Sequence, residues 1–470
     1  MKIQSIIVFI LTAILSLQCS KTRDDIAGIW EGNLKLPGFE SRIVFTIEIH
    51  DNNYSGIFSK PDESDNEFII DKISFENKSI HVSINAIQGD FRGNFDFEKN
   101  LFKGIWSQGK FQQSIVLNKI SRVYKTPRPQ TPLPPFPYNS QYISFENKQD
   151  NITLSGSLSW PSTGNDFTTI ILIQGGGSHD RDYTIFRHQP FLVLSDFLTK
   201  QGFAVLRWDE RGVGNSTGNG MSATSADFAK DVLSAIDFLK KSPLFKTNNI
   251  GLIGHSEGGN VASETAKMNR DVSFVILLGC PGLPGDRYQC QFEESTARAM
   301  GLSDESIEKR IILQRKILEI VFEEPNNDTV EMKLKTLFKT LNPNFTDERL
   351  NQAIARFLSP WFQHNAKYDP EKTLLQVNCP ILAIYGEKDL HVPPEGNVEV
   401  IQKVINKTNC RQSKVVVLPN LNHFFQNNVK NIPFRYGEFE ETISPVVLEL
   451  ILAWIPRSVA VLRNGTNGLG

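Results

Sequence analysis

The residue best suited to nucleophilic chemistry is Ser256, which stands in the run Gly254-His255-Ser256-Glu257-Gly258. An apolar, strand-like run from Ile250 precedes it, and small residues typical of a helix follow from Asn260. A Gly-x-Ser-x-Gly pattern between a strand and a helix predicts a nucleophile elbow, a tight turn with strained backbone angles. The glycines are needed because a side chain there would collide with the neighbouring strand and helix. Such a turn presents the Ser256 hydroxyl above the edge of a sheet.

A serine hydroxyl becomes a good nucleophile only when a base removes its proton. Among the eight histidines, His423 is best placed, because it follows the last expected strand, at the sheet edge where the elbow lies. Asp389 follows the preceding strand and can orient the His423 ring. We therefore predict a catalytic triad of Ser256, Asp389 and His423. Glu387 is the alternative acid, and His391 is the alternative base.

The negative charge that forms on an attacked carbonyl oxygen requires two backbone N–H donors. We expect the first from Glu257, because its N–H lies at the start of the helix and points to the same place as the Ser256 hydroxyl. We expect the second from Gly176, in the glycine-rich loop at 175–182 after a buried strand, with Gly177 as the alternative. Glycines there let the backbone approach a substrate closely.

Charged residues near these positions are more typical of structural ion pairs than of catalysts. Asp180, Arg181 and Asp182 stand in the glycine-rich loop, and Asp209 and Arg211 stand in the loop after the next expected strand. No Gly-x-Gly-x-x-Gly pattern opens a helix, and the five cysteines match no zinc pattern. The expected chemistry therefore needs no metal and no cofactor.

From residue 140 onward, strand-like and helix-like runs alternate, which is typical of a mostly parallel sheet covered by helices. We expect this arrangement over residues 140–457, which would position the residues named above. The expected strands are 142–145, 152–160, 168–174, 203–208, 250–254, 274–278, 381–385 and 415–418, and helices are expected at 227–240 and 446–455. The tail at 458–470 is expected to be disordered.

The strand pattern stops between residues 285 and 370. Three runs there, at 305–321, 330–341 and 347–358, have helical periodicity. An insertion after the strand next to the elbow would lie above Ser256 as a lid and form much of the acyl pocket. The alternative is a group of helices that only thickens the domain.

The part of the chain before residue 140 has a different pattern. Residues 24–122 contain short alternating runs separated by turns, such as Ile43, Phe45, Ile47 and Ile49 on one face of a strand. They predict a small antiparallel β domain, a barrel or a sandwich, that is accessory to the catalytic one. Residues 123–139 hold six prolines and are expected to form an extended linker.

Residues 1–19 are typical of a signal peptide, with a basic Lys2 and an apolar run at 6–17 that is too short to span a bilayer. Cys19 stands where the lipobox of bacterial lipoproteins has its lipidated cysteine, although Gln18 is not the small residue usual before it. The resemblance implies export to the cell envelope, with Cys19 as a lipid anchor. Ordinary secretion and an uncleaved anchor are the alternatives.

Composition adds few further constraints. The chain has 470 residues, of which 40% are hydrophobic, enough for two or three domains with a sizeable core. Its net charge of −2 gives no indication of a nucleic-acid partner. Cys280 and Cys290 would either pair in an oxidising compartment or remain buried thiols. The oligomeric state stays open.

Residues 141–455 resemble the α/β-hydrolase superfamily, and within it the bacterial esterases grouped with serine aminopeptidase-like and prolyl-oligopeptidase-like domains. The triad order of serine, acid and histidine is also that of the superfamily. The matching motifs are Gly-Gly-Gly-Ser-His-Asp-Arg-Asp from Gly175, Trp-Asp-Glu-Arg-Gly-Val-Gly-Asn-Ser from Trp208, Gly-His-Ser-Glu-Gly-Gly from Gly254, Cys-Pro-Ile-Leu-Ala-Ile-Tyr-Gly-Glu-Lys-Asp from Cys379 and Leu-Asn-His from Leu421.

This resemblance implies an α/β fold with a mostly parallel sheet and a helical lid, preceded by the antiparallel β domain. It also implies hydrolysis of a small-molecule ester through an acyl-enzyme intermediate, because members with such a β domain in front are similar to carboxylesterases. A peptidase or amidase acting on small peptides is one alternative. A non-catalytic binding protein on a hydrolase scaffold is another.

Overall fold

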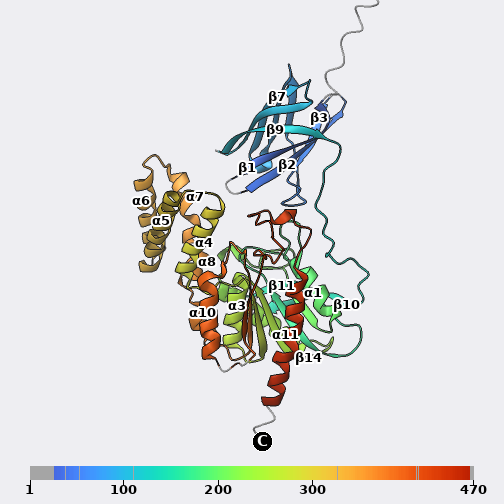
Figure 1. Ribbon diagram of the computed structural model, residues 1–470, viewed down its shortest axis with the longest axis vertical. Helices are drawn as coiled ribbons and strands as arrows, with labels where there is room; N and C mark the ends of the chain where they lie inside the picture. Colours follow the sequence, from blue (N-terminus) through green and yellow to red (C-terminus); the bar gives the residue numbers. More distant parts are fainter. Residues whose placement is uncertain are drawn as a thin grey trace, which may run out of the picture. The chain divides into compact units, whose positions relative to one another are not determined.

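The computed structural model describes residues 26–36, 39–51, 53–109, 111–324, 326–408, 410 and 412–465. The chain divides into two compact units, Met1–Thr126 and Pro127–Gly470 (Figure 1). The boundary between them falls within the proline-rich stretch at 123–139. The signal peptide predicted at 1–19, with Cys19, lies outside the described residues.

The N-terminal unit contains one curled antiparallel sheet of nine strands in the order β4-β3-β2-β1-β9-β8-β7-β6-β5 (Figure 1). Its buried face is rich in aromatic side chains, and the fully buried rings of Trp30 and Phe102 meet with centroids 4.6 Å apart. The strands are β1 Gly28–Leu36, β2 Phe39–His50, β3 Asn53–Ser59, β4 Glu67–Ile69, β5 Lys72–Glu76, β6 Ser79–Ile84, β7 Gly89–Asp96, β8 Leu101–Gln108 and β9 Phe111–Ile120.

The C-terminal unit is built on an eight-stranded sheet in the order β10-β11-β13-β12-β14-β15-β16-β17. β10, β11 and β13 pair antiparallel, and every pair from β13 to β17 is parallel. The central strands are buried along most of their length, which explains their continuous apolar runs. The strands are β10 Asn139–Asn147, β11 Ile152–Trp160, β12 Asp166–Ile173, β13 Ala204–Trp208, β14 Lys246–His255, β15 Val272–Leu278, β16 Ile381–Gly386 and β17 Lys414–Leu418.

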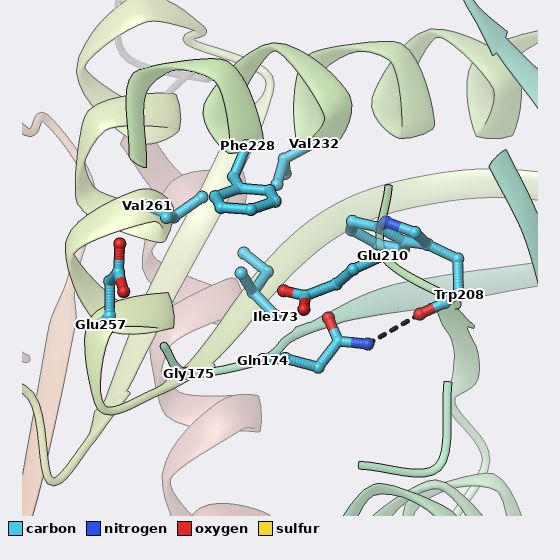
Figure 2. A pocket seen from close by; sticks show the side chains of 9 residues that line it. All are labelled: Ile173, Gln174, Gly175, Trp208, Glu210, Phe228, Val232, Glu257 and Val261. Carbon is cyan, nitrogen blue, oxygen red and sulfur yellow. Dashed lines mark hydrogen bonds between the residues drawn. The ribbon is translucent and has the colours of Figure 1, made fainter. Parts of the chain in front are cut away.

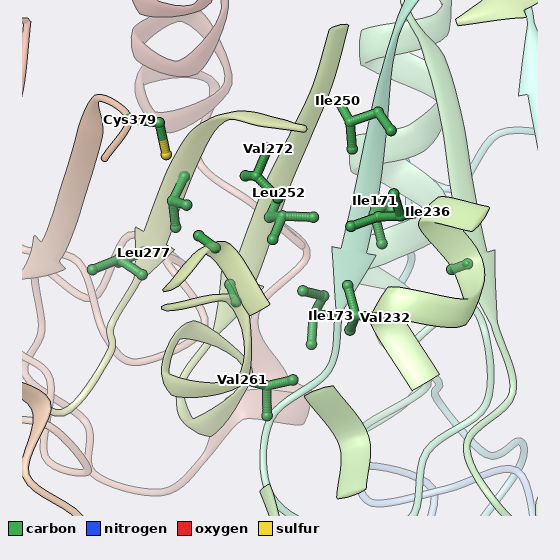
Figure 3. Close-up of a cluster of buried hydrophobic side chains, with 14 of the residues drawn as sticks. Ile171, Ile173, Val232, Ile236, Ile250, Leu252, Val261, Val272, Leu277 and Cys379 are labelled. Carbon is green, nitrogen blue, oxygen red and sulfur yellow. The ribbon is translucent and has the colours of Figure 1, made fainter. Parts of the chain in front are cut away.

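Helices cover both faces of this sheet, and each face has its own hydrophobic core. On one face, side chains of α2 Ser225–Lys241, α3 Glu257–Met268 and α10 Pro394–Lys407 pack on the strands. Figure 3 shows part of this core, with Val232 of α2 and Val261 of α3 near strand residues. On the other face, α1 Pro190–Lys200 and α11 Pro445–Gly465 form the second core. The fold class predicted from the sequence is confirmed.

A group of helices is inserted between β15 and β16: α4 Gly285–Ala299, α5 Asp304–Glu323, α6 Asn327–Leu341, α7 Asp347–Leu358, α8 Pro360–Lys367 and α9 Pro370–Leu374. It has a core of its own, which includes Leu318, Leu334 and Phe362. The sequence indicated helices where α5, α6 and α7 lie and missed α4, α8 and α9. α4 buries only three of its residues and so has little apolar periodicity, and α8 is only eight residues long.

Two other parts of the chain differ from the sequence-based expectations. Helix α11 continues to Gly465, so 458–465 is helical rather than disordered, and 466–470 lies outside the described residues. The stretch at 127–130, within the expected extended linker, is held on the C-terminal unit. Arg128 donates to Gly437 O at 2.7 Å and Phe439 O at 2.8 Å, and this fixes it on the C-terminal unit.

Two further observations concern the cysteines and the helices. The described cysteines, Cys280, Cys290, Cys379 and Cys410, are all free thiols. The Cys280 thiol donates to Asn260 Oδ1 at 3.2 Å, so Cys280 and Cys290 do not form the disulfide that the sequence left open. Within the described ranges, no helix combines the length and the apolar character needed to cross a membrane.

Candidate active site

Ser256 stands at the sharp turn between β14 and α3. Its backbone angles are φ 54° and ψ −125°, a region that non-glycine residues rarely adopt. A Cβ added at Gly254 would lie 2.1 Å from Gly258 O, and one at Gly258 would lie 2.3 Å from Gln174 O. Only glycine fits at either place, so the local sequence enforces the strained conformation expected of a nucleophile elbow.

Asp389 and His423 form a buried hydrogen-bonded pair at the same edge of the sheet. His423 Nδ1 lies 2.8 Å from Asp389 Oδ2, and each residue is only 3% exposed. Asp389 Oδ1 accepts from the backbone N–H groups of His391 and Val392, both at 2.8 Å. Glu387, the alternative acid, is exposed and accepts instead from the backbone of the loop after β17. Of the two candidate acids, only Asp389 is bonded to His423.

Contacts from neighbouring strands place the Ser256 turn beside this pair. Ser256 N donates to Leu278 O at 2.8 Å, and a Cβ added at Gly279, the next residue, would lie 3.2 Å from Asp389 Oδ2. His255, next to Ser256, is engaged elsewhere, because its Nε2 lies 2.8 Å from His423 O. In the described part of the chain, no hydrogen bond joins the Ser256 hydroxyl to the His423 ring. Such bonds often form only when substrate is bound.

The electrostatics of the pair follow from its burial. Burial lowers the pKa of His423 to about 3, so the imidazole is neutral at pH 7 and can accept a proton. Burial raises the pKa of Asp389, whereas the two backbone N–H donors oppose that rise. His391, the alternative base, stacks on His423 with ring centroids 4.6 Å apart. It therefore lies beside the pair rather than between Asp389 and His423.

The residues that carry the two predicted oxyanion donors lie close together. Glu257 is the first residue of α3, and a Cβ added at Gly176 would lie 2.8 Å from its Oε2 atom. A Cβ added at Gly175 would lie 3.0 Å from Ser256 Cβ, so this loop runs directly beside the elbow. The His179 ring lies 3.0 Å from Gly176 O and helps to orient that peptide. Backbone from both elements thus converges near Ser256.

Most charged residues of the two neighbouring loops form ion pairs, whereas Asp180 accepts from the backbone N–H groups of Asp182 and Thr184. Arg181 Nη2 lies 2.6 Å from Asp209 Oδ2, and Arg211 Nε lies 2.6 Å from Asp231 Oδ2. Asp182 pairs with an arginine of β13. The structural role expected for these residues agrees with these contacts, although Asp209 and Arg211 have separate partners rather than each other. The ion pairs hold the loops that flank the elbow.

A pocket beside the elbow contains two carboxyl groups that sequence reasoning did not single out together (Figure 2). Glu210 is 6% exposed, and its Oε2 accepts from the backbone N–H of His179 at 2.8 Å. Burial raises the pKa of Glu210 well above its usual range, and the nearby Glu257 adds to that rise. The lining residues are Ile173, Gln174, Gly175, Trp208, Glu210, Phe228, Val232, Glu257 and Val261.

The inserted helices touch both sides of the site. Trp361 of α8 donates its indole N–H to the Glu257 carboxylate. On the other side, Phe292 of α4 packs on His391, with ring centroids 5.6 Å apart. Sequence reasoning did not find these contacts, because no local pattern reports which helix residues face the elbow. Within the described ranges, no group of three or more potential ligands could hold a metal ion.

Comparison with known proteins adds a family and several relatives. A family model described as serine aminopeptidase, S33, matches residues 168–429. Esterase EstD of Thermotoga maritima is 23% identical over 314 residues, which cover 66% of this chain and 68% of that protein. The human mitochondrial palmitoyl-protein thioesterase ABHD10 is 26% identical over 218 residues, covering 46% of this chain and 56% of that protein. An esterase structure from Pyrococcus furiosus matches with a TM-score of 0.42 and 17% identity, over 68% of this chain and 92% of that one.

Proposed function

The chain belongs to the serine aminopeptidase S33 family, and on that basis we propose that it is a serine carboxylesterase with Ser256 as nucleophile. The observation that carries the proposal is the buried pair of Asp389 and His423, bonded at 2.8 Å beside the strained Ser256 turn. A neutral imidazole that is held by a carboxylate and lies next to an elbow serine is the arrangement that acyl transfer needs.

The proposed reaction has two halves. His423 Nε2 takes the Ser256 proton while Ser256 Oγ attacks the ester carbonyl carbon, and the resulting oxyanion accepts from the N–H groups of Glu257 and Gly176. The C–O bond to the alcohol then breaks, and His423 gives its proton to the leaving oxygen. Water, deprotonated by His423, attacks the acyl-enzyme and releases the acid. Asp389 holds the ring tautomer and stabilises its cation throughout.

An ester substrate is supported by the printed names of two relatives, an esterase and a palmitoyl-protein thioesterase. The family description, a serine aminopeptidase, supports a peptidase or amidase as the second candidate. A series of p-nitrophenyl esters with graded acyl chains, assayed beside aminoacyl p-nitroanilides, separates the two. Under the esterase proposal, kcat/KM for the best ester exceeds that for every anilide, and the reverse order would establish the peptidase.

The nucleophile is tested with a matched pair of variants. Ser256→Ala should lower ester turnover by roughly four to six orders of magnitude, because it removes the attacking atom. Ser263→Ala is the control: it removes another serine hydroxyl of α3, which donates to Gly259 O at 2.8 Å, and should leave turnover nearly unchanged. A fluorophosphonate probe should label the wild type and Ser263→Ala but not Ser256→Ala. Activity retained by Ser256→Ala would exclude this mechanism.

Two further parts of the proposal rest on the sequence and on helix placement. We propose that the helices between β15 and β16 act as a lid, since Trp361 and Phe292 reach residues on either side of the elbow. We also propose that the protein is exported to the cell envelope and lipidated at Cys19, which its lipobox-like position supports. The lipid anchor would place the esterase activity at the membrane surface, and the lid would cover its active site.

A further inference from the structure

The backbone N–H and the side-chain carboxylate of Glu257 have different surroundings and different roles. Its backbone N–H is a proposed oxyanion donor, while its side chain is held by neutral groups and the residue is only 9% exposed. Trp361 Nε1 donates to Oε1 at 2.9 Å and to Oε2 at 2.8 Å. Asn365 Nδ2 donates at 3.1 Å, and Ser225 Oγ donates at 2.5 Å. In the described part of the chain, all hydrogen-bond partners of this carboxylate are uncharged donors.

A buried carboxylate without a cation depends on its hydrogen bonds, because burial removes the water that would otherwise solvate it. Two of the three donor residues, Trp361 and Asn365, belong to α8. They are four residues apart and so lie on one face of that helix. The solvation of the Glu257 carboxylate is therefore tied to the position of an inserted helix rather than to the elbow itself.

The other oxyanion donor is in contact with the same indole ring. A Cβ added at Gly176 would lie 3.4 Å from Trp361 Cζ2 and 2.8 Å from Glu257 Oε2. The Trp361 side chain thus packs against the Gly176 backbone and bonds to the residue that supplies the opposite donor. A shift of this one side chain would disturb both sides of the oxyanion hole.

The neighbouring residue on α8 fixes the helix to the lid. Phe362, next to Trp361, is fully buried in the core shared by the inserted helices. Ser359 caps the helix and accepts from Phe362 N. One part of this short helix is therefore anchored in the lid core, while Trp361 and Asn365 hold Glu257.

We propose that Trp361 is a positioning residue that sets the oxyanion hole through the Glu257 side chain, so that seating of the lid is coupled to transition-state stabilisation. This inference rests on the proposed esterase function. It assigns the Glu257 carboxylate a structural task and not a role in proton transfer or in binding a charged substrate. Because the oxyanion forms only after attack, the coupling acts on kcat rather than on substrate binding.

The first test removes one hydrogen-bond donor and keeps an aromatic ring. Trp361→Phe should lower kcat for p-nitrophenyl butyrate on the order of tenfold, less than the roughly 10²–10³ that loss of a whole donor costs, with KM changed less than about twofold. Trp454→Phe is the matched control, because it removes an indole bond from α11 to Gln412 O at 2.9 Å and should leave kcat unchanged. An increase in KM at constant kcat for Trp361→Phe would make Trp361 a pocket wall and overturn the proposal.

The second test separates position from charge. Glu257→Gln keeps an oxygen that can accept from Trp361, so it should lose clearly less kcat than Glu257→Ala, which should lose on the order of tenfold. Adding Trp361→Phe to Glu257→Ala should cause no further loss, since both changes remove the same link. A Glu257→Gln variant as slow as Glu257→Ala would show that the charge itself acts, and would overturn the proposal.

These measurements also separate this inference from the esterase function. Circular dichroism and the midpoint of thermal unfolding show whether each variant is folded. The rate at which a fluorophosphonate labels Ser256 provides a readout that needs no substrate, and should follow the same order as kcat. Normal ester turnover with no effect of Trp361→Phe would overturn the positioning role alone. No labelling of Ser256 in the wild type would overturn both proposals.

Discussion

Replacing Asp389 by asparagine tests the proposed pair most directly. The asparagine side chain is nearly isosteric with that of Asp389, and its amide oxygen can still accept from the backbone N–H groups of His391 and Val392, which lie 2.8 Å from Asp389 Oδ1. Its amide nitrogen, however, is a donor at the place where Asp389 Oδ2 accepts from His423 Nδ1 at 2.8 Å. To avoid facing a donor with a donor, His423 must place its proton on Nε2. That nitrogen then cannot take the Ser256 proton.

The expected loss is about 10⁴-fold in kcat, the scale known for a wrong tautomer in a serine triad, or about 5.5 kcal/mol at about 1.36 kcal/mol per factor of ten. The fold should survive, because the backbone bonds to the retained oxygen remain. The assay is kcat on p-nitrophenyl butyrate, with unfolding midpoints measured in parallel. The control is Glu387→Gln, an exposed change that keeps an acceptor for Asn420 N, and we expect kcat within about twofold.

The result that would refute this reasoning is an Asp389→Asn variant that keeps more than about a tenth of wild-type kcat. It would mean that His423 does not depend on Asp389 for its tautomer. A large loss in Glu387→Gln together with a small loss in Asp389→Asn would move the acid to Glu387. Either outcome can be interpreted only if the thermal unfolding midpoints of both variants are close to that of the wild type.

Three other predictions address pH, stability and location. Burial raises the pKa of Glu210, so the folded state holds a proton that the unfolded state loses above about pH 4.3. Wild-type stability should therefore fall as pH rises from there toward the folded pKa, and Glu210→Gln should remove that decline. Unfolding midpoints that change with pH in the same way in wild type and Glu210→Gln, from about pH 4 to 9, would disprove this prediction. Arg128→Ala should cost about 3 kcal/mol of unfolding free energy in urea titrations, because it removes bonds to carbonyls of two loops, whereas the exposed Arg298→Ala should have little effect. Cys19→Ala should move the protein from the membrane to the soluble fraction, or leave its precursor uncleaved; unchanged membrane partitioning on cell fractionation would exclude Cys19 as the anchor.

The parts of the site that the sequence could indicate are those set by the chain's local order. Gly254 and Gly258 bracket Ser256 because the turn itself excludes larger residues, and that requirement is written in five consecutive residues. Asp389 and His423 were placed by a topological rule, since loops after parallel strands meet at one edge of a sheet. These predictions needed no knowledge of how the side chains pack.

What the sequence could not indicate depends on contacts between distant segments. Trp361 meets Glu257 across 104 residues, and His391 stacks on His423 across a whole strand and helix. Arg128 belongs to a proline-rich stretch whose composition indicates an extended, semi-rigid linker, yet its guanidinium bonds to the carbonyl of Phe439, 311 residues away. α4 was missed because it has few large apolar residues, and so little apolar periodicity to reveal it.

The separate core of the inserted helices has a consequence for how enzymes of this kind change. A segment that buries its own apolar side chains, Leu318 and Leu334 among them, can be lengthened, shortened or exchanged by recombination without opening the sheet beneath it. Under the proposed lid role, such an exchange alters the substrate range and leaves Ser256, Asp389 and His423 in place. The exception is α8, because a transplanted segment without Trp361 and Asn365 would leave Glu257 without those donors. A chimera that replaces α5 to α7 but retains α8 respects this boundary.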